Sequence, residues 1–356
     1  MSRKFILHIG SHKTGTSSIQ AALYENRHHL EQNGLSLFFE SDDGEDREDG
    51  HPGGWTRPFP DPIHGATISA MLADKIATLP GDVIMCLENF SWVFSPKELT
   101  RFQGELRKHF DEIQIIVYLR RQDQLMVSHH QQASKEWRFM PARLFGNSPT
   151  ALPEISEGVK LYCDYNTRLG LWADAFGAQQ ITIRVFEKEH LIDGDAVKDF
   201  ASVIGHTLPI DPGHKNESHG FIRAKVGHLM NQRKYERSHR KWLNGYLDNS
   251  GKLLPSRDQA ERFYAQFETS NCELNEQFKI SEKPSVFSTD FSMYPNGPAD
   301  QWSEELADLA IGNLLQAYSY PMSFRPADGL LLDQMIETLK KSHPQDAWTL
   351  AKLFGR

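Results

Sequence analysis

Cysteine is scarce in this chain, and no apolar run is long. The 356 residues include three widely spaced cysteines, Cys86, Cys163 and Cys272. They form no C-x-x-C pair or Cys/His cluster, which excludes the usual zinc patterns, and an odd, sparse count is typical of a reducing compartment. No apolar run approaches the ~20 residues that are needed to cross a bilayer. We therefore expect no metal, no transmembrane segment and a cytoplasmic location.

The start of the sequence also predicts no leader segment, and the chain has no excess of positive charge. The apolar pattern of a first strand begins at Phe5, which leaves no room for a signal peptide. The formal net charge is −8, so the surface as a whole does not favour nucleic acid. Basic residues do gather between 214 and 242, where there are eight Lys and Arg and two Glu. They form either the solvated face of a helix or, through Lys215, Arg223 or Lys225, part of a site for an anionic ligand.

Strand-like and helix-like patterns alternate along the first two hundred residues. Apolar runs predict strands at 5–9, 83–87, 115–119 and 180–185, with a further short run at 35–39. Helical patterns cover 17–33, 66–78, 96–109, 123–137, 163–176 and 194–204. The alternation predicts an α/β fold, a P-loop-like three-layer α/β/α arrangement with a mostly parallel central sheet and a helical C-terminal extension. We expect one domain over 1–320 and a helical tail, 321–356, packed on it.

Two stretches have the composition of loops. Residues 41–63 are polar and rich in Pro and Gly, which predicts no regular structure, and 138–160 also resemble a loop. We expect both to shape a pocket for an acceptor molecule, although a tryptophan in a loop is as often a local packing residue. The candidate lining residues are Trp55, Arg57, Trp137 and Arg138.

The strongest chemical signal lies in residues 4–20, KFILHIGSHKTGTSSIQ. An apolar strand stops at Gly10, a short loop of small and hydroxyl residues follows, and a helix begins near Ser17. Backbone N–H groups of such a loop and the positive end of the helix converge on one point, which suits a phosphate. Gly10 and Gly15 let the backbone turn and approach the anion closely. Lys13 adds a positive charge, and hydroxyl donors are supplied by Thr14, Thr16, Ser17 and Ser18.

The position of the lysine separates this loop from the kinase type. The kinase pattern G-x-x-x-x-G-K-[ST] has its lysine directly after the second glycine, whereas Thr16 follows Gly15 here and the lysine is residue 13. The form K-T-G-T-S-S resembles the 5′-phosphosulfate loop of sulfotransferases that use 3′-phosphoadenosine 5′-phosphosulfate (PAPS) as donor. For this segment alone, an ordinary glycine-containing turn is the alternative.

A second segment, residues 115–132, carries the same resemblance. It predicts a buried strand, a polar turn and a helix with Asp123 as its N-cap. Arg120 ends the strand, and Ser128 follows eight residues later. In sulfotransferases an arginine and a serine at this spacing bind the 3′-phosphate of the nucleotide, and a guanidinium suits phosphate because it donates two parallel hydrogen bonds. The alternative for this segment alone is a solvated turn at Arg120 and Arg121 and a surface serine.

Glu88 follows the predicted strand at 83–87 and is the first candidate for a general base. The carboxyl ends of parallel strands share one crevice, so we expect His8, Glu88 and Arg120 to lie near it. By resemblance to the family, Glu88 takes the proton of the attacking hydroxyl. Alternatively, it caps the next turn or pairs with Lys13. His8, His12 and His64 are rival candidates for the base.

Over residues 4–295 the chain resembles the soluble, bacterial type of PAPS-dependent sulfotransferase. The resemblance implies that the backbone amides of 13–18 hold the 5′-phosphate and that Lys13 stabilises the leaving oxygen. It implies that Arg120 and Ser128 hold the 3′-phosphate, with no metal, and that adenosine 3′,5′-bisphosphate (PAP) is the product. The family's R-K-G-x-x-G-D-W-K-N element is absent, and Lys215 is the candidate substitute.

The acceptor class follows less directly from these residues. We expect a small molecule or glycan that offers a hydroxyl, and a saccharide is preferred. An ATP-using P-loop phosphotransferase and a non-catalytic nucleotide-binding protein are the alternatives. The displaced lysine counts against the first of these alternatives, and the presence of both Lys13 and Glu88 counts against the second.

Overall fold

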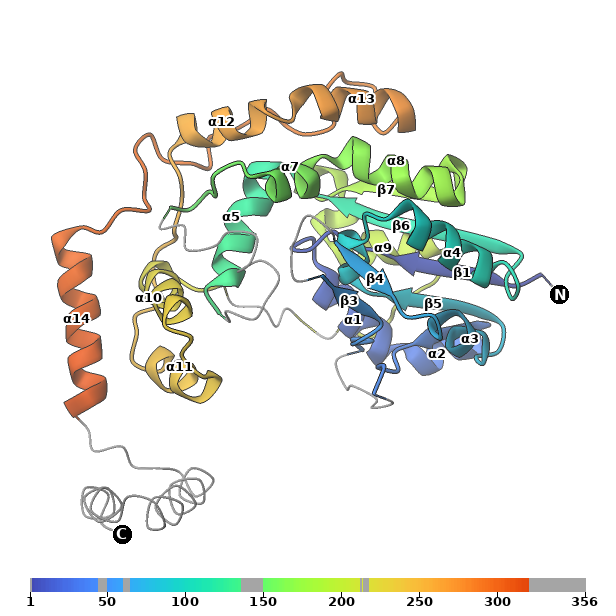
Figure 1. The fold of residues 1–356 in the computed structure, drawn as a ribbon, viewed down its shortest axis with the longest axis horizontal. Helices are drawn as coiled ribbons and strands as arrows, with labels where there is room; N and C mark the ends of the chain where they lie inside the picture. The colour runs from blue at the N-terminus through green and yellow to red at the C-terminus, as the bar shows by residue number, and fades with distance from the viewer. Residues whose placement is uncertain are drawn as a thin grey trace, which may run out of the picture.

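A sheet of five parallel strands forms the centre of the described structure. The computed structural model describes residues 2–43, 50–59, 65–135, 150–211, 213 and 218–319. The strand order is β2-β5-β1-β6-β7, and each neighbouring pair is parallel (Figure 1). The strands are β1 (Lys4–His8), β2 (Leu35–Phe38), β5 (Asp82–Cys86), β6 (Glu112–Leu119) and β7 (Ile181–Val185). The predicted α/β class with a mostly parallel sheet is confirmed.

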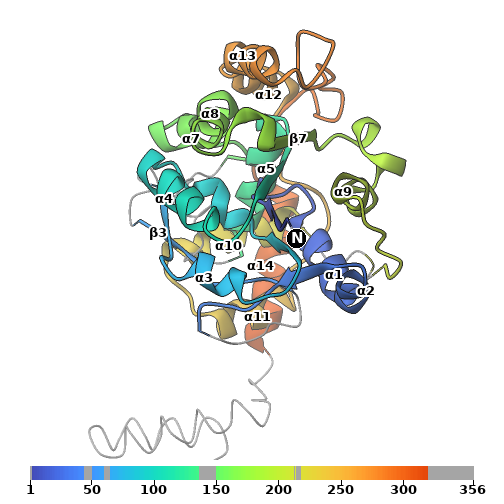
Figure 2. The same cartoon turned by 90° about the vertical axis from the view of Figure 1, so that its right-hand side faces the viewer.

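Helices cover both faces of this sheet. Successive side chains of a strand point to opposite faces, so Phe5 and Leu7 join one apolar core while Ile6 joins the other. Figure 2 shows α3, α4 and α8 on one side and α1, α2 and α9 on the opposite side. These helices are α1 (Thr16–Glu25), α2 (Arg27–Gln32), α3 (Leu72–Ala77), α4 (Pro96–Leu106), α8 (Tyr165–Phe176) and α9 (Ala196–Ile204).

The C-terminal half adds helices beside the sheet. A third apolar cluster, which includes Phe221, Leu243 and Ala310, joins α10, α11 and α14. Helices α12 and α13 pack on α5 and α8 (Figure 1). The remaining helices are α5 (Gln122–Ala133), α7 (Glu157–Cys163), α10 (Phe221–Gln232), α11 (Arg237–Asn244), α12 (Arg257–Ala265), α13 (Glu268–Phe278) and α14 (Glu304–Ser319). The predicted tail, 321–356, lies outside the described residues. In the part of the chain described, no helix has both the length and the apolarity to cross a bilayer.

Four local predictions are wrong in part. The expected helix at 17–33 is divided at Asn26, whose side chain donates to the carbonyl of Ala22. The expected helix at 66–78 begins later, because Ala66–Ile68 is strand β4 and pairs antiparallel with β3 (Thr56–Pro58). Strand β3 also gives regular structure to the stretch that was expected to have none. The end of the expected loop at 138–160 is helical from Glu157, while 136–149 lie outside the described residues.

Candidate functional site

The loop between β1 and α1 is a tight turn with three residues of positive φ. These are Gly10 at 97°, Lys13 at 61° and Gly15 at 81°. The Ser11 N–H donates to the carbonyl of Tyr118 on β6. The hydroxyls of Thr14 and Thr16 both donate to the carbonyl of Ser11, so in this structure they hold the loop together.

Helix α1 begins directly behind this turn. Gly15 occupies its N-cap position, and the carbonyl of Gly15 accepts from the N–H groups of Ser18 and Ile19. The amides of the first helical turn otherwise lack intrahelical acceptors, and the helix dipole is positive at this end. Ser17 is exposed and Ser18 is partly exposed. The predicted strand, glycine turn and helix N-terminus therefore follow one another as expected, with the geometry of an anion-binding turn.

Arg120 joins the second predicted element to this loop. It follows the last residue of β6, and its Nη1 donates to the carbonyl of Lys13 at 3.1 Å. Its own carbonyl accepts from the hydroxyl of Tyr165 at 2.6 Å. Burial lowers the pKa of Arg120, which is the direction expected for a cation that has lost hydration. Two segments that are 107 residues apart in sequence thus share a single hydrogen bond at the carboxyl edge of the sheet.

Ser128 lies on α5 along the helix edge that begins beside Arg120. Gln124, Ser128 and Gln132 are the α5 side chains that are not buried, and their spacing of four residues places them in one row. Gln124 Oε1 lies 3.5 Å from Arg120 Nε. Lys215, the remaining predicted nucleotide residue, lies outside the described residues.

Lys13 is a cation whose charge is strongly disfavoured by its surroundings. Burial lowers its pKa to about 8, and the positive charges of Lys135 and Arg120 act in the same direction, while Glu88 opposes them. A buried ammonium near other cations is stabilised by any anion that binds between them. The residues therefore fit the phosphate and sulfate groups of a nucleotide donor. Lys135 was not identified in the sequence, because its position at the end of α5 carries no motif.

Glu88 stands at the end of β5, as predicted, and it begins the short helix η2 (Glu88–Trp92). Its Oε2 accepts from Gln20 Nε2 at 3.1 Å, and its Oε1 lies 3.9 Å from His51 Nε2. A Cβ placed on Gly10 would lie 3.1 Å from Glu88 Cβ. Gly10 is therefore required for close contact between the loop after β1 and Glu88, in addition to its positive φ.

The rival histidines occupy protein-internal roles. His8 is fully buried with its Nδ1 2.9 Å from Cys86 Sγ, and burial lowers its pKa to about 4. His12 Nε2 accepts from the indole N–H of Trp92, and its Nδ1 contacts the hydroxyls of Tyr162 and Ser91. Burial lowers the pKa of His12 to about 4 as well. These contacts favour Glu88 as the base, and His64 lies outside the described residues.

Two arginines of the site were missed or misjudged in the sequence. Arg168 on α8 is buried, donates to Ser11 Oγ at 2.9 Å and to the carbonyl of Tyr162 at 3.2 Å, and so supports the loop from behind. Arg121 is not part of a solvated turn, because its side chain is fully buried in an ion pair with Asp123. Asp123 is accordingly not the N-cap of α5, which begins after Arg121. Neither the arginine within the helical pattern at 168 nor the second arginine of the turn at 120–121 gives a sequence signal for these contacts.

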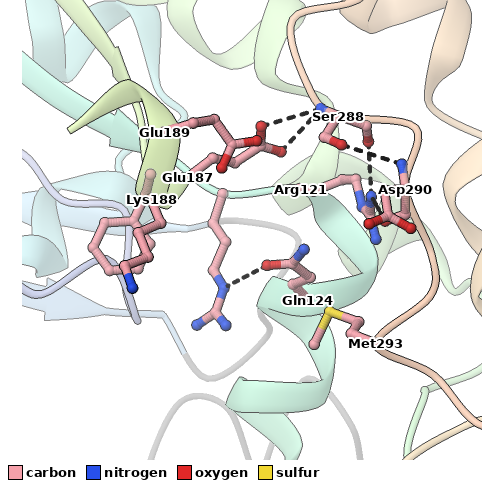
Figure 3. A pocket seen from close by; sticks show the side chains of 10 residues that line it. Arg121, Gln124, Glu187, Lys188, Glu189, Ser288, Asp290 and Met293 are labelled. Carbon is pink, nitrogen blue, oxygen red and sulfur yellow. Dashed lines mark hydrogen bonds between the residues drawn. The ribbon is translucent and has the colours of Figure 1, made fainter. Parts of the chain in front are cut away.

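A cavity of about 320 Å³ opens beside Arg120 (Figure 3). The end of β7, the start of α5 and the segment after α13 line it; the residues are Arg120, Arg121, Gln124, Phe186, Glu187, Lys188, Glu189, Ser288, Asp290 and Met293. Arg120 lies 5.8 Å from the centre of the Phe186 ring. At its rim both oxygens of Glu187 accept from the Ser288 N–H. An aromatic ring and an arginine at one cavity suit the base and phosphate of a nucleotide.

The structure describes two of the four residues that were predicted to line an acceptor pocket. Trp55 is buried against Phe38, and its indole N–H donates to the carbonyl of Glu40, so it is a packing residue. Arg57 is exposed and pairs with Asp42 at 2.9 Å. Trp137 and Arg138 lie outside the described residues.

The chain is similar to known proteins both in sequence and in structure. No family model matches the chain. In sequence, it is similar to an uncharacterised protein of Archaeoglobus fulgidus, with 24% identity over 235 residues, which is 62% of this chain and 60% of that protein. In structure, it is similar to a sulfotransferase from Alicyclobacillus acidocaldarius, with a TM-score of 0.41 and 14% identity, covering 78% of this chain and 97% of that chain. Neither match assigns an activity to this chain.

Proposed function

We propose that this protein transfers a sulfuryl group from PAPS to an acceptor hydroxyl, with a saccharide as the preferred acceptor class. The observation that carries the proposal is the hydrogen bond from Arg120 to the carbonyl of Lys13. It brings the two nucleotide segments to one edge of the sheet, with Glu88 against the same loop. A site that holds two anionic groups and a carboxylate base suits a doubly phosphorylated donor and a hydroxyl acceptor.

The loop would hold the 5′-phosphosulfate. In this proposal the amides of residues 13–18 donate to the phosphate, and the Lys13 ammonium lies against the oxygen that leaves the sulfur. Positioning and charge stabilisation of this kind supply most of the catalysis in transfer of phosphoryl groups, and sulfuryl transfer makes the same demand. Lysine and amides then neutralise the charge for which kinases use magnesium.

Arg120 and Ser128 would select the donor by its 3′-phosphate. Arg120 can donate two parallel bonds to a phosphate, and Ser128 lies on the row of α5 side chains that begins beside it. The cavity at Phe186 has room for part of the nucleoside. ATP carries no 3′-phosphate, so this pair provides a physical basis for preferring PAPS.

Glu88 would act as the base. Its carboxylate is partly exposed, with 18% of the side-chain surface accessible, so a hydroxyl can reach it. The contact with Gly10 brings its backbone next to the loop that holds the sulfuryl donor. A reactive carboxylate beside the donor is a requirement of transfer and not of nucleotide binding alone.

Calorimetric titration tests the proposal directly. Purified protein is titrated with PAP, with ADP, and with ATP and magnesium. We expect PAP to bind much more tightly than ADP, since only PAP carries the 3′-phosphate. Tighter binding of ATP with magnesium would instead support a phosphotransferase, and binding of none of the three would contradict a nucleotide-dependent function.

A further inference from the structure

The two oxygens of the Glu88 carboxylate have different surroundings. Gln20 Nε2 donates to Oε2 at 3.1 Å and to the carbonyl of Cys86 at 3.1 Å, so both hydrogens of the Gln20 amide are used. Oε1 instead faces His51 Nε2 at 3.9 Å. One oxygen is therefore fixed by an amide that cannot exchange protons with it, and the other faces a group that can.

His51 lies beside Glu88 because the segment that contains it packs closely on α1. The neighbouring residue, Gly50, has φ of 70°, and a Cβ on it would lie 2.8 Å from both the carbonyl of Gln20 and Cβ of Tyr24. Only glycine permits this approach. The backbone of Gln20 thus packs against Gly50, and its side chain binds Glu88. These two contacts of one residue hold His51 close to Glu88.

Both partners of the pair are open to solvent in part. The accessible fraction of the side chain is 26% for His51 and 18% for Glu88. The other titratable groups that act on Glu88 are Lys13, His8, His12 and Cys86. His8 and Cys86 are buried, and His12 is engaged by Trp92, Tyr162 and Ser91. Lys13 is partly exposed, but it is a cation assigned to the donor, so His51 is the partly exposed imidazole that faces Glu88 Oε1 among the described residues.

We propose that His51 is a positioning residue that passes the acceptor proton from Glu88 to solvent. The inference rests on the proposed function. As the acceptor oxygen bonds to sulfur, the bond from sulfur to the bridging oxygen of the 5′-phosphate breaks, and its electron pair stays on the PAP leaving group. The hydroxyl proton moves to Glu88 Oε1 and then to His51 Nε2, and it leaves to solvent from that same nitrogen, because His51 Nδ1 is buried. Because 3.9 Å exceeds a hydrogen bond, the pair must close by about 1 Å or use one bridging water.

The test uses a reaction for which no acceptor has to be known. PAPS is incubated with the full chain and no added hydroxyl compound, so that water is the acceptor, and release of PAP is followed. His51→Ala and His51→Gln are compared with the wild type, and Glu88→Ala is included. The matched control is His28→Ala, since His28 is an exposed histidine on α2 that contacts Glu31. The Kd for PAP and the free energy of unfolding are measured for every variant.

We expect His51→Ala to release PAP ~10-fold more slowly, which is less than the ~10²–10⁴-fold that a general base contributes. Its Kd for PAP stays unchanged, and added imidazole restores part of the rate. Imidazole restores nothing in Glu88→Ala, and His28→Ala behaves as wild type. His51→Gln fills the same space without a titrating group, so it loses rate like His51→Ala and shows whether packing alone matters.

Several outcomes would overturn the relay and leave the proposed function standing. One is an unchanged rate in both His51 variants, or a loss that imidazole does not restore. Another is a wild type that binds PAP but releases none from PAPS, because a working pair would deprotonate water at the same place. Imidazole rescue of His51→Ala together with wild-type activity in Glu88→Ala would make His51 itself the base and also overturn the relay. Failure of the wild type to bind PAP would instead contradict the proposed function itself.

Discussion

Arg168 Nη2 donates a hydrogen bond to Ser11 Oγ over 2.9 Å, and this bond ties helix α8 to the first turn after strand β1. The guanidinium also donates to the carbonyl of Tyr162 and lies about 5 Å from the rings of Tyr162 and Tyr165. Tyr165 in turn donates to the carbonyl of Arg120. A single helix, α8, therefore contacts both the loop after β1 and the residue that follows β6.

Arg168→Met keeps the length of the side chain and removes its donors. We expect the free energy of unfolding to fall by about 1–3 kcal/mol, since the Ser11 hydroxyl and the Tyr162 carbonyl lose a buried charged partner. PAP binding should weaken as well, because the loop loses its support. Urea denaturation and calorimetry measure the two effects, and unchanged stability with unchanged Kd would show that the bond does not organise the loop.

Lys13 predicts a pH dependence of nucleotide binding. Its pKa is lowered to about 8 by burial and neighbouring cations, so in the free protein it loses its charge as the pH rises through 8. An anionic ligand binds the charged form, and the phosphates of PAP are already ionised at pH 7. We therefore expect the Kd for PAP to rise between pH 7 and pH 9, by at most about tenfold per pH unit.

Lys13→Ala is the control for this pH effect. The variant should fold, should bind PAP weakly with a Kd that no longer rises over that interval, and should have no transferase activity. The same rise in Kd with pH in the variant would assign the titration to another group.

Arg120→Ala should weaken PAP binding by ~1.5–3 kcal/mol, which is the worth of a hydrogen bond to a charged group and corresponds to a ~10–150-fold higher Kd. The Kd for ADP should change much less, since ADP lacks the 3′-phosphate. An equal loss for both nucleotides would mean that Arg120 acts only by holding the carbonyl of Lys13.

Arg121→Ala provides a neighbouring contrast. Its side chain is fully buried, pairs with Asp123 and donates to the carbonyls of Ser288 and Asp290. Removing one partner of a buried ion pair typically costs ~3–5 kcal/mol. We expect a loss of that size in the free energy of unfolding, measured with urea. Arg120 would then contribute to ligand binding, and Arg121 to the stability of the fold. Wild-type stability in Arg121→Ala would contradict this division.

Gly10→Ala tests the contact between the loop and the base. A φ of 97° is strained for alanine, at about 1–3 kcal/mol, and the added methyl would lie 3.1 Å from Glu88 Cβ. We expect displacement of Glu88 and a larger fall in kcat for PAPS cleavage than in affinity for PAP. Gly104→Ala is the control, because a Cβ at Gly104 on α4 meets no atom within 4 Å. Equal effects of the two substitutions on kcat would argue against the contact.

The sequence predicted the parts of the site that depend on local order. A strand, a glycine turn and a helix follow directly from apolar pattern and backbone preference, and the ends of parallel strands always share one edge, so Lys13, Glu88 and Arg120 could be placed near one another. Asp123 shows where this fails. Its residue type and position predicted an N-cap. In the structure, its carboxylate instead pairs with the buried guanidinium of Arg121 and accepts a hydrogen bond from the hydroxyl of Tyr294.

The predictions that Trp55 lines a pocket and that residues 66–68 are helical are wrong for a similar reason. The segment around Trp55 is rich in turn residues, but Thr56–Pro58 finds hydrogen-bonding partners in Ala66–Ile68, and the indole is buried against Phe38. Pairing of this kind depends on which strand lies alongside, and local composition does not contain that information.

By itself, the sequence determined the α/β class, the order of the sheet-forming segments and the residue types at the loop and strand ends, because these follow from apolar period and backbone stereochemistry. Only the tertiary structure decided that Arg168 supports the loop, that Gln20 holds one oxygen of Glu88 and that His51 faces the other. These relationships join residues between 37 and 157 positions apart. Side chains so distant in sequence meet only when the sheet and its helices have packed, since each contact depends on the combined geometry of several elements.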